Sequence, residues 1–291
     1  MIATQVRVLR ILTIGVVCVS CFGPPTRPIP AADPVQLLKD RPYDLLAPDG
    51  TDPAPLIVAL HGQGGGGPEI GNDLMLTALV KERGFYLALP DGTSNEAGYS
   101  WWNATTNGLP PYDRVYLKAL IEDVQKKHAI DPKRVYLVGF SIGAFMAYRL
   151  ACDDAPAIAA VMSFSGAATR DPEQCPTSSA VSVAEVHGDH DDVIDYYGGP
   201  FIGGAQSGPS ARDTVKLWAG NDHCTGQLAD VDRIDYTPDL PGSETKRQAY
   251  AGCPAGVSVE LWTVEGGAHA NNNYPTLGAL IVDWLYAHPK Q

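Results

Sequence analysis

From about residue 41 onward, short apolar runs alternate with stretches in which apolar residues recur at helical spacing. The run 55–60 is apolar throughout, which is typical of a strand buried on both faces. The alternation predicts an α/β fold: a mostly parallel sheet with helices on both faces. The predicted strands are 41–46, 55–60, 85–90, 134–138, 159–164, 181–186 and 257–263, and the predicted helices are 72–83, 116–128, 144–152 and 277–288.

The pattern divides the chain into a short leader and one long body. Residues 93–111 show no clear periodicity and are predicted to form a long loop, a feature that is often functional in compact domains. We find no internal repeat and no boundary that would split the body. The sequence therefore predicts an export segment with a proline-rich tether at 1–32 and a single catalytic domain at 33–291.

The leader has the features of a bacterial export signal. Arg7 and Arg10 precede the apolar run 11–19, which is too short to span a bilayer as a stable helix. Two alternatives remain open for how the signal is processed. Ser20-Cys21 resembles a lipobox, and lipidation of Cys21 would attach the protein to a membrane; ordinary cleavage near Ala31 would release it into the periplasm or the medium.

Charge then narrows the classes of partner. The chain has 291 residues, of which 45% are hydrophobic and 19% charged, with a formal net charge of -12. The leader contains no acid, so residues 33–291 hold 18 basic and 33 acidic side chains. Such a surface repels nucleic-acid phosphates and anionic membranes, which argues against a nucleic-acid partner. A neutral substrate, such as an uncharged ester, meets no such barrier.

Removal of the leader would leave four of the six cysteines: Cys152, Cys175, Cys224 and Cys253. An even number in an oxidising compartment predicts two disulfides, for which three pairings exist. Sequential pairing closes the shortest loops, and we predict it. A metal site is not expected, because these cysteines form no CxxC and no Cys/His pair at ligand spacing.

The clearest chemical motif is Gly139-Phe140-Ser141-Ile142-Gly143, which lies between a predicted strand and a predicted helix. A G-x-S-x-G turn between a strand and a helix exposes a serine above the sheet, and it needs small neighbours two residues to either side. The alternative is a plain glycine-rich turn. With a strand before it and a helix after it, the motif predicts Ser141 as a nucleophile that needs a neighbouring base.

His269 is the best candidate for that base. It follows the last predicted strand across Glu265-Gly266-Gly267-Ala268. The carboxyl edge of an open α/β sheet is where sites assemble. The other late histidines are less suitable, since His223 lies in a polar insertion and His288 lies at the end of the final helix.

The acid that would orient the histidine should come from His187-Gly188-Asp189-His190-Asp191-Asp192. This run could also be read as a metal site, but no partner cluster occurs elsewhere in the chain. Asp189, Asp191 and Asp192 all satisfy the order serine, acid, histidine. Spacing alone does not choose among them.

Two backbone amides are predicted to form the oxyanion hole. Ile142 opens the helix after the nucleophile, where N–H groups are free, and Gln63 lies in the loop after the buried strand. The aromatic run Tyr99-Ser100-Trp101-Trp102 suggests substrate contacts for Trp101 and Trp102. Core packing is the alternative for both indoles.

Together these residues resemble the polyhydroxybutyrate depolymerase-like and feruloyl esterase-like α/β-hydrolases of bacteria, over most of residues 41–287. The resemblance implies Asp191 as the triad acid, four residues after the histidine of a His-Gly-x-x-Asp pattern, and it supports both disulfides. The motifs that carry it are Leu60-His61-Gly62, Trp102-Asn103-Ala104, Ile130 to Tyr136, the Ser141 turn with Ala147 to Cys152, His187-Gly188 with Asp191, and Gly266 to His269.

The chain departs from the family pattern at three positions. Gln63 stands where the depolymerases have cysteine, Ala144 replaces a glycine after the elbow, and no tryptophan follows His269. The change at Ala144 is small and keeps the start of the helix compact, whereas the differences at Gln63 and after His269 lie near the site and bear on the substrate, not on the mechanism. We also find no separate polymer-binding domain.

The sequence thus predicts an exported, cofactor-free serine esterase of the polyhydroxybutyrate depolymerase-like type. Alternatives of the same fold are a feruloyl or acetylxylan esterase acting on plant polysaccharide esters, and an acyltransferase. A non-catalytic envelope protein is a third possibility, disfavoured by the complete set of triad residues.

Overall fold

A computed structural model of the protein describes residues 32–94, 98–104, 112–200, 207–270 and 274–291. The predicted export signal with Cys21 and part of the predicted loop 93–111 lie outside these residues. The residues from Ala32 onward form one compact unit.

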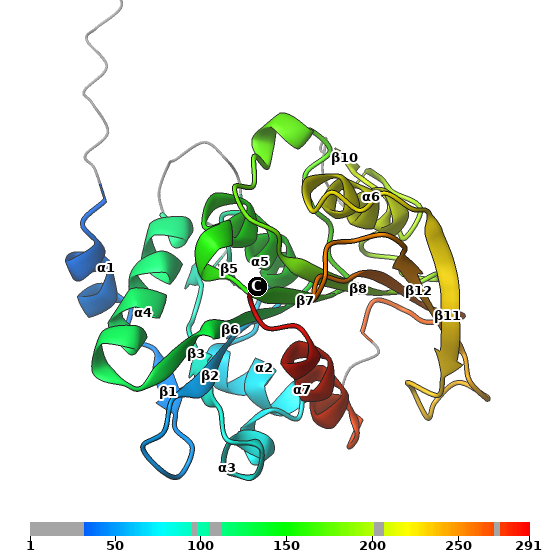
Figure 1. Ribbon diagram of the computed structural model, residues 1–291. Helices are drawn as coiled ribbons and strands as arrows, with labels where there is room; N and C mark the ends of the chain where they lie inside the picture. Colours follow the sequence, from blue (N-terminus) through cyan, green and yellow to red (C-terminus); the bar gives the residue numbers. More distant parts are fainter. Residues whose placement is uncertain (1–31, 95–97, 105–111, 201–206, 271–273) are drawn as a thin grey trace, which may run out of the picture. The chain divides into compact units, whose positions relative to one another are not determined.

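The described residues contain a large mixed sheet whose centre is parallel (Figure 1). Its strand order is β1-β3-β2-β6-β7-β8-β13-β12-β11. The parallel strands are β2 (Ala54–Leu60), β3 (Tyr86–Leu89), β6 (Ile130–Phe140), β7 (Ala160–Phe164), β8 (Ser182–Gly188) and β13 (Val259–Val264). The antiparallel strands at the margins are β1 (Asp44–Leu46), β12 (Thr245–Tyr250) and β11 (Leu228–Ile234). Two separate short pairs are β4 (Thr93–Ser94) with β5 (Ser100–Trp101), and β9 (Gly199–Pro200) with β10 (Ser207–Gly208).

Helices cover both faces of the sheet (Figure 1). On β2, Leu56, Val58 and Leu60 pack into one core cluster, while Ile57 and Ala59 pack into the other. All seven residues of β2 are buried, as its apolar run predicts. The helices on the first face are α4 (Asp113–Lys127), α5 (Ile142–Asp153) and α6 (Ala211–Asn221), and those on the second are α2 (Gly67–Asp73), α3 (Val80–Arg83) and α7 (Leu277–Ala287). The predicted α/β fold is confirmed.

The helix predicted at 72–83 is wrong. Helix α2 starts at Gly67, with proline in its first turn, and ends at Asp73. Met75 then adopts a φ of 54°, which no α-helix contains, before a 3-10 turn (Thr77–Leu79) leads into α3. The reason is tertiary: α7 packs closely on this bend, since a Cβ on Gly278 would lie 2.3 Å from the Met75 carbonyl oxygen.

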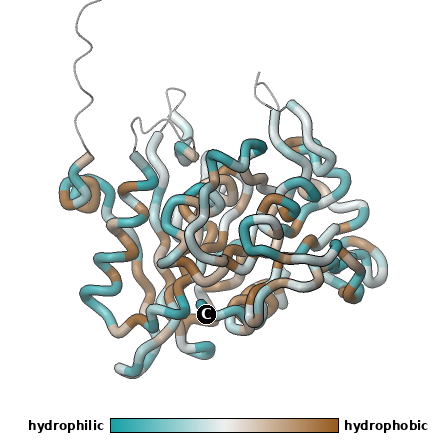
Figure 2. The backbone as a smooth tube through the Cα atoms, turned by 45° about the horizontal axis from the view of Figure 1, so that its top comes forward, coloured by the Kyte–Doolittle hydropathy of each residue, from teal (hydrophilic) through white to brown (hydrophobic). Residues whose placement is uncertain are grey.

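Among the α-helices and the strands of the large sheet, four described elements have no counterpart in the predicted pattern: α1 (Pro34–Asp40), α6, β11 and β12. Five of the seven residues of β11 are exposed, so the strand lacks the apolar alternation by which strands are recognised. Main-chain pairing and ion pairs such as Lys246–Asp230, at 2.9 Å, hold the hairpin together. Figure 2 shows the contrast between the hydrophobic central strands and more polar segments of the chain.

Disulfides join Cys152 to Cys175 and Cys224 to Cys253. The first ties the end of α5 to the loop after β7, and the second closes the segment around β11 and β12. The predicted sequential pairing is confirmed. Among the described residues, no helix is both long enough and apolar enough to cross a membrane.

Candidate active site

Ser141 lies at the junction of β6 and α5, with a φ of 54°. Its two glycine neighbours are required by close contacts. A Cβ on Gly139 would lie 2.4 Å from the Gly143 carbonyl oxygen, and one on Gly143 would lie 2.2 Å from the Leu60 carbonyl oxygen. The sharp turn therefore fits only with glycine at both positions, which is the physical reason for the G-x-S-x-G pattern.

The structure brings Ser141, His269 and Asp191 together at the carboxyl edge of the sheet. His269 Nε2 lies 3.0 Å from Ser141 Oγ, and His269 Nδ1 lies 2.8 Å from Asp191 Oδ2. Ser141 follows β6, His269 follows β13 and Asp191 follows β8, so separate parallel strands deliver them to one place. Ser165, after β7, donates its hydroxyl to the His269 carbonyl at 2.9 Å and fixes the histidine loop.

The Asp191 carboxylate is fixed by hydrogen bonds at both of its oxygens. Its side chain is fully buried, and its Oδ1 accepts the backbone amides of Val193 and Ile194 at 2.9 and 2.8 Å. Burial alone would raise the pKa of the carboxyl. The hydrogen bonds from His187 and His269 and from the Ile194 amide outweigh it and hold the pKa well below its ordinary value. Asp191 is therefore ionised at neutral pH.

The other acids of the same run have different surroundings. Asp189 accepts the Gly266 amide at 2.6 Å and pairs with His190, while Asp192 is exposed. Of the remaining late histidines, His288 contacts the Trp284 carbonyl within its own helix end. Within the described ranges, no group of three potential ligands is arranged to hold a metal ion.

The two predicted oxyanion donors belong to residues that line the cavity of Ser141: Gln63 and Ile142. His61, at the start of the Gln63 loop, was noted in the sequence only as part of a motif. Its Nε2 accepts the Gly92 amide at 2.9 Å, and its Nδ1 donates to the Gly62 carbonyl at 2.7 Å. Burial lowers the pKa of His61, which suits this neutral tautomer. The imidazole thereby fixes the loop.

The cavity in front of Ser141 and His269 has a volume of about 970 Å³. Trp101 lines it and is half-buried. Trp102 is also among the lining residues, but it is fully buried and its indole N–H donates to the His61 carbonyl at 3.0 Å, so it supports the wall. The exposed side chains of Tyr99 and Val193 also line the cavity.

The cavity wall also carries two acids, Glu69 and Asp73. Burial, and then the nearby charge of Glu69, raise the pKa of Asp73 above its ordinary value. No lysine or arginine is among the residues that line this cavity in the described part of the chain. The wall therefore disfavours an anionic ligand and accepts a neutral one.

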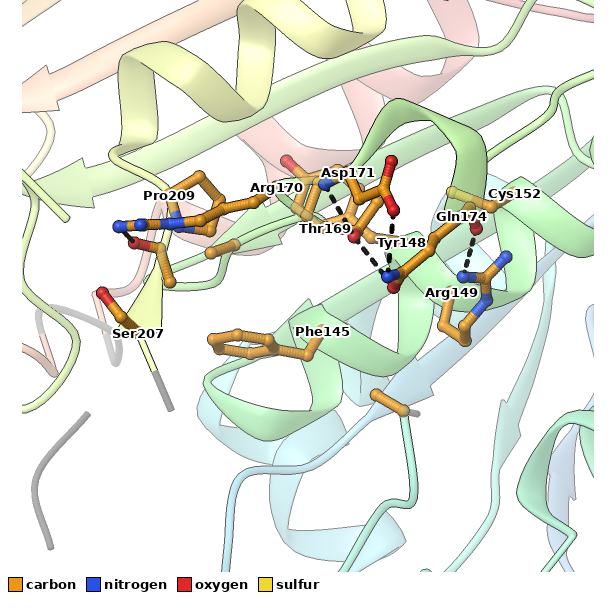
Figure 3. A pocket seen from close by; sticks show the side chains of 14 residues that line it. Phe145, Tyr148, Arg149, Cys152, Thr169, Arg170, Asp171, Gln174, Ser207 and Pro209 are labelled. Atoms are coloured by element: carbon orange, nitrogen blue, oxygen red, sulfur yellow. Dashed lines mark hydrogen bonds between the residues drawn. The ribbon is translucent and has the colours of Figure 1, made fainter. Parts of the chain in front are cut away.

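A second cavity, of about 450 Å³, adjoins the first and shares Ala104 and Phe145 with it (Figure 3). Its polar side contains Arg149, which donates to the Gln174 carbonyl at 2.6 Å and pairs with Asp153. These contacts tie α5 to the segment that ends in the Cys152–Cys175 disulfide. Arg149 therefore stabilises the wall of this second cavity.

Two buried residues behind Asp191, Glu185 and His187, escaped the sequence analysis as functional candidates. Glu185 Oε1 lies 2.9 Å from His187 Nδ1. The sequence did contain a signal for this pair, because a glutamate within the apolar run of β8 needs a buried partner.

Comparison with known proteins finds similarity to esterases. Residues 112–202 match the phospholipase/carboxylesterase family model. The chain is 26% identical over 231 residues to feruloyl esterase B of Piromyces equi, which covers 77% of this chain and 41% of that protein. It is 25% identical over 257 residues to poly(3-hydroxyalkanoate) depolymerase C of Paucimonas lemoignei, covering 79% of this chain and 60% of the depolymerase. In both cases the chain spans less than two thirds of the relative.

Among solved structures, the acetyl xylan esterase from Aspergillus awamori superposes with a TM-score of 0.65 at 17% identity, covering 84% of this chain and 93% of that one. At this identity the likeness shows the fold alone. The chain therefore has the fold of the α/β-hydrolase esterases and is similar in sequence to a feruloyl esterase and to a poly(3-hydroxyalkanoate) depolymerase.

Proposed function

We propose that the protein is an exported serine esterase that hydrolyses neutral carboxylic esters through an acyl-enzyme. The observation that carries the proposal is the position of His269, whose two ring nitrogens lie 3.0 Å from Ser141 Oγ and 2.8 Å from Asp191 Oδ2. A base in contact with both a hydroxyl and a buried carboxylate is what an activated serine requires.

In this mechanism Ser141 Oγ attacks the ester carbonyl carbon while His269 Nε2 takes the hydroxyl proton. Asp191 keeps the proton of His269 on Nδ1 and stabilises the imidazolium that forms. His269 then protonates the leaving alcohol, and the acyl group stays on Ser141. A water that His269 activates attacks the acyl carbonyl, and the serine leaves with the proton that His269 returns.

The oxyanion formed in both steps would accept hydrogen bonds from the backbone amides of Ile142 and Gln63. The N-terminus of α5 supports this role, since the first amides of a helix are free and its dipole favours negative charge. Each such donor contributes roughly a hundred- to a thousandfold in rate.

The cavity supports a neutral ester as substrate. Glu69 and Asp73 repel a carboxylate, which favours the departure of the acid product over its retention. Trp101 offers an aromatic face to an apolar acyl or alcohol group. The names of the relatives suggest three classes to assay: hydroxyalkanoate polyesters, feruloyl esters and acetylated xylan. A panel of these substrates with short-chain p-nitrophenyl esters would rank them.

The decisive test is Ser141→Ala, with Ser243→Ala as the matched control on an exposed serine of the β11–β12 loop. We expect kcat/KM for p-nitrophenyl acetate to fall by about 10⁴-fold or more in Ser141→Ala, at unchanged melting temperature. The control should keep the wild-type rate. Hydrolysis by Ser141→Ala at the wild-type rate would refute the proposal. Added alcohol that diverts the acyl group into a new ester would indicate an acyltransferase instead.

Export is supported by the arginine-led apolar leader and by the two disulfides, which persist in oxidising compartments. Intact-mass analysis of the membrane and soluble fractions tests it. A mature chain that begins at a diacylated Cys21 would indicate a lipoprotein, one that begins near Ala32 a released enzyme, and a full-length cytoplasmic chain would contradict export.

A further inference from the structure

His187 has hydrogen-bond acceptors at both ring nitrogens. Nδ1 lies 2.9 Å from Glu185 Oε1, and Nε2 lies 2.8 Å from the Ile194 carbonyl oxygen and 3.2 Å from Asp191 Oδ2. A neutral imidazole carries one N–H, so one of its nitrogens would face an acceptor without a proton. The ring is 1% exposed, and water cannot relieve that mismatch. The geometry therefore calls for a proton on both nitrogens.

The partners of Glu185 point to an ionised carboxylate. Its side chain is fully buried, and Oε2 accepts the hydroxyl of Tyr148 at 2.6 Å. Oε1 accepts the Gly166 amide at 3.2 Å in addition to the contact with His187. Two N–H groups and one hydroxyl surround the two oxygens, and this set suits an anion.

The charges around His187 agree with this reading. Burial alone would lower the pKa of the imidazole, but the contacts with Asp191 and Glu185 outweigh it and raise the pKa to about 10. The edge of the Tyr196 ring also contacts His187. The titratable or charged groups in contact with it, or one residue beyond, are Glu185, Asp191, Tyr196, Tyr148 of α5, Arg212 of α6, Tyr197, Asp189 and His269.

The hydrogen-bonded side chains close into a ring. From Ser141 the contacts run through His269, Asp191, His187 and Glu185 to Tyr148, which lies on α5, the helix that begins after Ser141. Helix α5 is thus connected to Asp191 by two routes. One runs through Ser141 and His269, and the other runs through Tyr148, Glu185 and His187. His187 also binds the carbonyl of Ile194, whose amide binds Asp191.

We propose that Glu185 and His187 are positioning residues for the triad: a buried imidazolium at His187 balances the charge of Glu185 and anchors Asp191 and the loop that carries it, and Glu185 keeps that imidazolium in place. The inference rests on the proposed serine-esterase function of the same site. The Glu185–His187 pair is neutral as a whole, so the field at His269 is that of one carboxylate, Asp191. Without the charge of His187, His269 would face two unbalanced carboxylates.

The first test is the pH profile of kcat/KM for His187→Gln. Glutamine can still donate toward Ile194, but the charge of Glu185 is left unbalanced and favours the protonated, inactive form of His269. We expect the acidic limb of the profile to move up by about one pH unit. The loss in kcat/KM should approach tenfold well below the limb and become smaller as the pH rises through it. An acidic limb at the wild-type pH would overturn the proposal.

The matched control is the double variant Glu185→Gln/His187→Gln, which removes both charges and is again neutral. It should return the acidic limb to within about 0.3 pH unit of wild type, while the single variant stays shifted. A merely structural role predicts no such rescue, because the double variant alters more of the packing. A double variant shifted as far as the single one would therefore contradict charge balance.

A direct measurement separates this inference from the proposed function. Nitrogen NMR of ¹⁵N-histidine-labelled protein, with the His187 signals assigned from the double variant, reports the protonation of each ring. We expect both His187 nitrogens to stay protonated from pH 6 to pH 9. A neutral His187 at pH 7.5 would overturn the inference even if Ser141 is the nucleophile. An active Ser141→Ala would overturn the proposed function whatever the state of His187. The NMR result also decides the matter if the single variant does not fold.

Discussion

Two parts of one sheet are built on different principles. At its centre, β2, β7 and β8 are buried along their whole length, and their carboxyl ends lead to the loops that carry the candidate site. At its margin, β11 is mostly exposed and is held by pairing with β12 and by ion pairs across the two strands. The first part depends on close packing, and the second on main-chain hydrogen bonds and solvated charges.

This difference predicts where a small substitution should have a large effect on activity or stability. In a close-packed region one added methyl group has no room, and its effect reaches the reacting atoms. In a solvated hairpin an exposed ion pair contributes little free energy, since water competes for both charges. The predictions below test this contrast, beginning with the largest expected effect.

Of the substitutions that test this contrast, Gly143→Ala should reduce activity most. Ala has the higher helix propensity, so on that ground alone the change at the start of α5 would be stabilising. The new Cβ would instead lie 2.2 Å from the Leu60 carbonyl oxygen, which must push the start of α5 away and displace Ser141. A displacement of about 1 Å costs roughly a hundredfold in rate, and we expect at least that loss in kcat/KM.

The matched control is Gly220→Ala, in the exposed last turn of α6, where no atom lies within 4 Å of the added Cβ. It should leave kcat/KM unchanged and raise the free energy of unfolding by about 0.5–1 kcal/mol. Wild-type activity in Gly143→Ala would show that the site tolerates movement. It would contradict the expected contrast between the close-packed centre and the solvated margin of the sheet.

Asp222→Asn should stabilise the protein in a pH-dependent way. Asp222 caps α6 and is fully buried; Oδ1 accepts the Val181 amide at 3.0 Å, and Oδ2 has no hydrogen-bond partner among the described residues. Burial raises the pKa of this carboxyl to about 7. Its unfolded value is about 3.9, so the folded state loses stability as the pH rises from about 4 to about 7.

Asparagine keeps the bond to Val181 and never ionises. We therefore expect the free energy of unfolding to rise by roughly 1–3 kcal/mol at pH 8 and by clearly less at pH 5, as measured by urea denaturation at both values. An equal change at the two pH values would mean that the ionisation of Asp222 is not the cause.

Asp232→Asn should have the smallest effect. Asp232 pairs with Arg247 across the β11–β12 hairpin, and its side chain is 42% exposed. We expect the free energy of unfolding to fall by less than about 1 kcal/mol and kcat/KM to remain unchanged. A loss comparable to that of a core substitution would show that the margin is as tightly coupled to the fold as the centre.

Much of the fold and part of the site could be predicted because local sequence carried the information. The run 55–60 is apolar enough to require burial on both faces, and the glycines around Ser141 mark a turn that excludes a Cβ. The β11–β12 hairpin was missed because its residues are largely polar. Main-chain pairing, of β12 with β13 and of β11 with β12, makes these segments strands. Helix 72–83 was misplaced because the bend at Met75 depends on contact with α7.

The candidate active site shows the same division between what the sequence and the tertiary structure determine. The sequence by itself determined the α/β class, the turn at Ser141, the histidine candidate and three possible acids. Only the tertiary structure placed His269 against Ser141 and Asp191, which lie 128 and 78 residues away from it in the chain. It also placed Glu185, His187 and Tyr148 behind them. The reason is physical: periodicity and close turns are local properties of a chain, whereas a hydrogen bond between side chains depends on how distant strands are ordered in the sheet.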